Sequence, residues 1–204
     1  MPLPPGCYYW RNDLPFMDSR FEDGIRKKGP FGLEMGLKKS DYPGSLLEVE
    51  SRPGCYQTKD VPKSHSAFED YILQFGQLSG LCWIKAIGKT IDSNSFGTNI
   101  QTAFDAMYKK LVKAYGPSED FSFLMEGSIW DEPRDWMEAL LCGDRILAAR
   151  WEATADLQLP NHLASIFLVA SALDTSSGYI AIEYSFKNKE SADEEVAALE
   201  DDAL

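Results

Sequence analysis

The sequence predicts an α+β domain in which helices cover a mainly antiparallel sheet, and three observations indicate this. Residues 98–115 repeat apolar side chains at the spacing of one helix face. Residues 71–75 and 81–87 are rich in strand-forming side chains and flank a turn, 76–80, that begins and ends with glycine. Residues 178–187 alternate apolar and polar side chains, as a strand with one buried face does.

The helix expected over residues 98–115 has one apolar face and one charged face. It ends at Gly116 and Pro117, because glycine accepts a left-handed cap and proline cannot continue the hydrogen-bond ladder. Its apolar face consists of Ile100, Ala103, Phe104, Met107, Tyr108, Leu111, Val112 and Tyr115. We expect this face to lie on the sheet, against the inward side of the last strand. That side consists of Ile180, Ile182, Tyr184 and Phe186.

A second, shorter helix is expected over residues 133–142 and packs on the same sheet. Asp131 is its expected N-cap and Pro133 suits its first turn. Its buried side consists of Trp136, Ala139 and Leu140. The remaining strands are expected at residues 31–36, 46–50, 55–61, 145–153 and 163–173. The last two of these and residues 178–187 form a three-stranded meander.

Composition divides the chain into three parts. Residues 1–30 are rich in proline and aromatic side chains and are expected to form an irregular arm. Residues 31–189 are expected to form the single α+β domain. Residues 190–204 contain seven acids and no base. This acidic C-terminal tail is either a solvated extension or a short helix started by the capping box Ser191–Glu194.

Net charge and cysteine usage limit the functions to consider. The chain has 20 Lys+Arg against 32 Asp+Glu, a net charge of −12, so we expect no direct binding to nucleic acid and a basic partner protein instead. It has no apolar run long enough to cross a membrane and no signal peptide, so we expect a cytoplasmic protein without membrane contact. Its four cysteines form no C-x-x-C pair, which favours reduced thiols, and Cys82 and Cys142 are expected in the core.

The usual signatures of catalysis and cofactor binding are missing from the sequence. His65 and His162 are far apart and neither has metal-ligand spacing. No glycine-rich phosphate loop and no G-x-S-x-G nucleophile elbow is present. We therefore expect no enzyme activity, no cofactor, no metal ion and no catalytic residue.

The segment from residue 119 to residue 144 is unusual because it mixes carboxylates with aromatic side chains. Aromatic side chains surrounded by charges are typical of a protein-binding hot spot. Two alternatives remain open: the acids near Pro133 suit an ordinary helix N-terminus, and close carboxylates suit hydrolysis or a divalent cation. The expected partner-binding residues are Glu119, Asp120, Phe121, Phe123, Glu126, Trp130, Asp131, Glu132 and Asp135, together with Glu194 and Glu195 of the acidic tail.

We expect the 119–144 segment and the tail to act differently in binding. The segment has the aromatic side chains that anchor a complex, whereas the tail supplies charge that speeds encounter. Deleting residues 190–204 should therefore slow association, and Trp130→Ala should speed dissociation.

Three stretches of the sequence carry a resemblance to a class of known proteins: residues 31–42 (FGLEMGLKKSDY), 127–136 (GSIWDEPRDW) and 178–186 (GYIAIEYSF). With the acidity and the α+β pattern, the chain resembles immunity proteins of bacterial polymorphic-toxin and type VI secretion effector systems. The resemblance implies a cytoplasmic protein that binds and inhibits one cognate toxin, and by analogy a basic nuclease. The alternatives are a small hydrolase using Glu126, Asp131 or Glu132, and an acidic DNA mimic of a mobile element.

Overall fold

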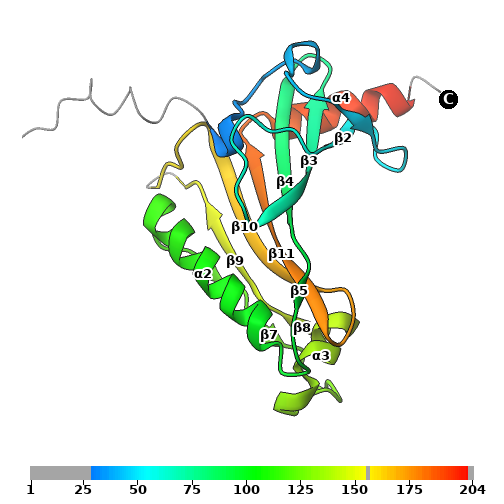
Figure 1. Ribbon diagram of the computed structural model, residues 1–204. Helices are drawn as coiled ribbons and strands as arrows, with labels where there is room; N and C mark the ends of the chain where they lie inside the picture. Colours follow the sequence, from blue (N-terminus) through cyan, green and yellow to red (C-terminus); the bar gives the residue numbers. More distant parts are fainter. Residues whose placement is uncertain (1–28, 155–156, 202–204) are drawn as a thin grey trace, which may run out of the picture.

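The computed structural model describes residues 29–154 and 157–201, and these form a nine-stranded, mainly antiparallel sheet with helices packed on it (Figure 1). The strand order is β1-β2-β3-β4-β11-β10-β9-β6, and β5 pairs with β11. Two further strands, β7 and β8, pair with each other. The strands are β1 (Leu47–Glu48), β2 (Cys55–Thr58), β3 (Phe68–Gly76), β4 (Gly80–Gly88), β5 (Ile91–Asp92), β6 (Glu119–Asp120), β7 (Phe123–Leu124), β8 (Arg145–Ile146), β9 (Ala148–Glu152), β10 (Leu163–Ala172) and β11 (Ser177–Phe186). The α+β prediction is confirmed.

The described helices are α2 (Thr98–Tyr115), α3 (Trp136–Cys142) and α4 (Lys189–Asp201). Short 3₁₀ turns occupy Pro30–Gly32, Lys39–Asp41 and Pro133–Asp135. Helices α2 and α3 contact β10, and α4 contacts β3 and β4. Among the described residues, no helix combines the length and the apolar character needed to cross a membrane.

The main helix and the strands it covers follow the sequence pattern. Four side chains of the predicted apolar face are fully buried, namely Ile100, Phe104, Met107 and Leu111. All four predicted inward side chains of β11 are buried in the same core. Gly116 ends the helix with φ 86°, its N–H donating to the Val112 carbonyl oxygen at 2.9 Å. The predicted hairpin, β3–β4, and the predicted meander, β9–β10–β11, are both present.

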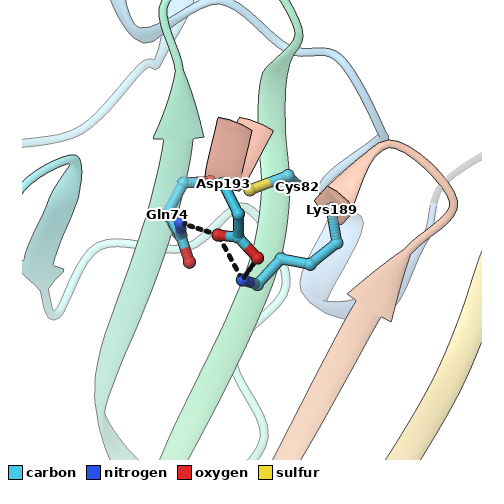
Figure 2. Close-up of polar contacts among 4 residues, drawn as sticks. All are labelled: Gln74, Cys82, Lys189 and Asp193. Atoms are coloured by element: carbon cyan, nitrogen blue, oxygen red, sulfur yellow. Dashed lines mark hydrogen bonds and ion pairs between the residues drawn. The ribbon is translucent and has the colours of Figure 1, made fainter. Parts of the chain in front are cut away.

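Helix α4 covers one end of the opposite face of the sheet. Ala192 packs there against Cys82 and Trp83 in a small separate core. Figure 2 shows the polar contacts around it: Gln74 Nε2 donates to Asp193 Oδ1 at 2.8 Å, and Lys189 Nζ reaches the same oxygen at 2.6 Å. Burial raises the pKa of the Cys82 thiol to about 12. The part of the acidic tail that the structure describes is therefore a docked helix.

Several local expectations from the sequence are wrong. Residues 31–36 do not form a strand; Phe31 has φ 55° inside a 3₁₀ turn. Its ring packs edge-on against Phe68, Tyr71 and Tyr184, with the Tyr71 centroid 4.8 Å away. This aromatic packing overrides the strand propensity of the segment.

The second helix also differs in detail from the expectation. Asp131 is not its N-cap, because the chain makes a 3₁₀ turn at Pro133–Asp135 before α3 begins at Trp136. The expected buried side, Trp136, Ala139 and Leu140, is confirmed. Cys142 is exposed at the end of α3 and not in the core. The arm predicted from residues 1–30 lies almost wholly outside the described residues.

Candidate functional site

The 119–144 segment lies at the end of the molecule where β7, β8 and α3 are found (Figure 1). It begins as the edge strand β6, in which Glu119 pairs with Arg150 of β9. It then forms β7, in which Phe123 pairs with Ile146 of β8. The sequence did not indicate β6 or β7, since strands of two residues are too short to show a periodic pattern.

A hydrogen-bonded turn between β7 and α3 is held by Asp144. The Met125 N–H donates to the Asp144 carbonyl oxygen at 2.7 Å, and the Ser128 hydroxyl donates to its carboxylate at 2.8 Å. The Ser128 oxygen in turn accepts the Trp130 N–H at 3.1 Å. Gly127, with φ 83°, supplies the left-handed conformation the turn requires. The segment is therefore fixed to the chain just after α3.

Helix α3 is itself fixed to the loop that precedes α2. Trp136 is 9% exposed and its ring lies directly against Gly97. The Met137 N–H donates to the Ser95 carbonyl oxygen at 3.0 Å, and the Arg145 guanidinium lies 5.7 Å from the Trp136 ring centroid. These contacts give the segment a rigid base.

Four large apolar side chains of this region are open to solvent. Ile129 is 78% exposed, Met125 47%, Phe123 46% and Leu141 41%. Trp130, between Ile129 and Asp131, is partly buried. Single exposed apolar residues are normal on a protein surface. Here four of them occur within 19 residues of chain, and hydrogen bonds hold this part of the chain together. We therefore treat it as a candidate interaction surface.

Some carboxylates of the segment are paired with arginines. Arg150 lies 3.1 Å from Glu119 and 3.3 Å from Glu152, and its guanidinium is 4.8 Å from the Phe121 ring centroid. Arg134 lies 2.8 Å from Glu132. These exposed pairs offset part of the negative charge of the segment.

The remaining predicted acids of the segment form at most one long ion pair among the described residues. Within residues 29–154 and 157–201, neither Glu126 nor Asp131 forms an ion pair, and both are exposed. Asp120 accepts the Ser122 N–H at 2.8 Å, and Asp135 is 3.9 Å from Arg134. Glu126 lies three residues before Ile129 and Asp131 lies two residues after it, so an acid is present on each side of this apolar residue in the sequence.

The two tail residues predicted to bind a partner lie elsewhere. Glu195 accepts the Leu78 N–H at 2.7 Å and the Ser79 N–H at 3.0 Å, so it attaches α4 to the β3–β4 turn. These N–H groups, that of Leu78 most, lower the pKa of Glu195. Glu194 is exposed on the same helix. Helix α4 and α3 lie at opposite ends of the sheet (Figure 1), so the predicted residues form two groups and not one surface.

The histidines and carboxylates show no arrangement typical of metal binding. Among the described residues, no group of three or more His, Cys, Asp and Glu side chains is placed to hold a metal ion. His65 accepts the Ala67 N–H through Nδ1 at 3.1 Å, while burial and the nearby Lys110 lower its pKa. His162 is exposed.

The carboxylates proposed for a hydrolase are exposed and do not line the cavity beside α3. That cavity, of about 450 Å³, lies at Pro133 and Trp136, and the acid that lines it is Asp105 of α2. Glu126, Asp131 and Glu132 are not among its lining residues.

The sequence analysis missed Met125, Ile129 and Leu141 as surface candidates. The signal available for the first two was their position two residues before and two residues after Gly127, in a stretch with no periodic apolar pattern that would bury them. Leu141 is on the outer side of a short helix, which only the packing direction reveals.

Comparison with protein-family models, with curated proteins and with solved structures finds no match.

Proposed function

We propose that this protein is an immunity protein: a stoichiometric inhibitor that binds a cognate bacterial toxin or effector domain. The observation that carries the proposal is the group of exposed apolar side chains next to free acids on the 119–144 segment. We call this group the apex surface; it consists of Phe123, Met125, Glu126, Ile129, Asp131 and Leu141.

The physical composition of the apex surface supports protein binding. Apolar anchors surrounded by charged residues are typical of interface hot spots, and a rigid base lowers the entropy lost on binding. The hydrogen bonds that Asp144 accepts and the packing of Trp136 provide that base. A partner that covers these apolar side chains would also remove them from water, which is favourable.

The net charge supports a basic partner. At −12 the chain attracts cationic proteins and repels nucleic acid, so the proposed partner is a basic domain such as a nuclease. The proposed site of action is the cytoplasm, with no catalytic step, cofactor, membrane contact or direct nucleic-acid contact. A hydrolase has weaker support, because Glu126, Asp131 and Glu132 are exposed and do not line the cavity beside α3 that could hold a substrate.

The experiment is co-expression with the product of the neighbouring gene, followed by a growth assay and a measured dissociation constant. Ile129→Asp should weaken the complex by about 30-fold or more and abolish protection, since it places a charge in the proposed interface. The control is Leu78→Asp at the far end of the sheet, where the side chain is 77% exposed, almost equal to Ile129. Equal effects of the two variants, or no complex with the wild type, would contradict the proposal.

The charge part of the proposal has its own measurement in the same assay. Replacing Glu126 by Gln and Asp131 by Asn should lower the association rate constant and reduce its dependence on salt. Helix α4 and α3 lie at opposite ends of the sheet (Figure 1), and the nine-residue strand β4 alone spans about 30 Å, which is several screening lengths at physiological salt. Neutralising Glu194 should therefore change the association rate much less, which differs from the role in encounter that the sequence suggested for the tail.

A further inference from the structure

A second candidate site lies at the opposite end of the sheet from the apex surface. A cavity of about 640 Å³ opens between the Lys39–Asp41 turn, the β1–β2 hairpin, the end of β3 and helix α4. Its size is within the range of small-molecule sites in proteins. The side chains that matter for its chemistry are Lys38, Lys39, Ser40, Tyr56, Phe75 and Val196.

One side of the cavity is apolar and partly aromatic. Phe75 is 5% exposed, and the Tyr56 ring packs edge-on against it with centroids 5.9 Å apart. Val196 of α4 closes this side, and a side chain at Gly54 would come within 3.2 Å of it. These groups form a preformed wall against which a flat or branched apolar body can pack.

The other side of the cavity is cationic. Lys39 Nζ donates to the Tyr56 hydroxyl at 2.9 Å and lies 4.0 Å from the Tyr56 ring centroid. These contacts hold the ammonium group at the wall, and since it has three donors, N–H groups remain for a ligand. Lys38 donates to the Leu78 carbonyl oxygen, and the Ser40 hydroxyl, which also lines the cavity, donates to Asp41 at 3.2 Å, so Lys39 is the available donor.

The lining charges favour an anion. Lys38 and Lys39 line the cavity with one carboxylate, Glu48, so the lining carries one surplus positive charge in a chain whose net charge is −12. A cation placed beside an apolar wall is complementary to a ligand with one carboxylate and an apolar body.

We propose that this cavity binds a small organic monocarboxylate with an aromatic or branched apolar body. The carboxylate lies at Lys39, and the apolar body packs against Tyr56, Phe75 and Val196. Because the cavity and the apex surface are at opposite ends of the sheet, this site is independent of the proposed toxin-binding function.

The test is a titration of the full chain with 3-phenylpropionate, followed by calorimetry and by NMR chemical shifts. We expect saturable binding with a dissociation constant of about 1 mM or tighter, with shifts at Tyr56, Gly76 and Val196. The uncharged 3-phenylpropionamide should bind at least about tenfold more weakly, because it lacks the charge that Lys39 pairs with.

Two variants and one control complete the experiment. Lys39→Met should weaken binding by about tenfold, whereas Lys109→Met, which removes the same charge from the exposed side of α2, should leave binding unchanged. Val196→Trp places a larger side chain in the open cavity and should abolish binding while the far-ultraviolet circular dichroism stays that of the folded wild type. No saturation by about 10 mM, equal binding of the amide, or equal effects of the two lysine variants would overturn the proposal.

Discussion

Replacing Gly97 by alanine tests whether the base of the apex surface depends on close packing against Trp136. Gly97 precedes α2 in the left-handed conformation, with φ 68° and ψ 19°. A Cβ atom there would lie 1.9 Å from Trp136 Cε3 and 2.2 Å from Cζ3. Carbon atoms in contact are normally about 3.5–4.0 Å apart, so the ring or the start of α2 must move by about 1.5 Å.

The cost can be worked out with a matched glycine. Gly143, which ends α3, has φ 80° and ψ 5°, and a Cβ atom there would meet nothing within 4 Å. Gly143→Ala should therefore cost only the left-handed backbone term, about 1 kcal/mol of unfolding free energy. Gly97→Ala has the same backbone term and adds an overpacking term of about 1–3 kcal/mol, so it should lower the unfolding free energy by about 2–4 kcal/mol in total.

Urea denaturation of both variants, with tryptophan fluorescence as the probe, measures this difference. The midpoint should fall further for Gly97→Ala with an unchanged slope, and the melting temperature should fall by about 2–4 °C per kcal/mol. Displacing Trp136 should also weaken the proposed toxin complex, because α3 supports the apex surface. If the two variants lose the same stability within about 0.5 kcal/mol, the packing of Trp136 on Gly97 does not hold α3 in place.

Two further predictions concern α4 and the thiols. The pKa of Glu195 is lowered, so its hydrogen bonds stabilise the fold fully at pH values above 4.5, the ordinary pKa of this group. This stability is lost as the pH falls below 4.5 and passes through the lowered pKa. Glu195→Gln should therefore flatten the acid side of the stability profile measured by denaturation, and Glu194→Gln, on an exposed neighbour, should not. For the thiols, labelling with a maleimide at pH 8 followed by peptide mass spectrometry should modify Cys142 quickly. Cys82 should stay unmodified in the folded protein, since it is buried with a pKa of about 12, and rapid labelling would show that α4 does not cover it.

The elements whose side chains repeat over many residues could be predicted without the structure. The α2 pattern spans five turns and the β11 pattern spans ten residues, so each apolar side chain adds to the same periodic signal. Gly116 marked the end of α2 because the positive φ of a helix cap favours glycine and the following proline cannot continue the helix. Both effects are local and therefore visible in the sequence. The acidity and the mixture of acids and aromatics in the 119–144 segment were also visible from composition alone.

The positions of the short and irregular segments depend on contacts made in the folded chain. Phe31 occupies a left-handed turn because three distant rings surround it, and no local pattern encodes that. Exposure of Ile129 and Leu141 depends on how a seven-residue helix and a turn dock on the sheet. Glu195 is far from the apex because β11, which leads directly into α4, ends beside the start of β4, where Ser185 pairs with Trp83. Contacts between residues far apart in sequence set these positions, and their energies leave no periodic signal along the chain.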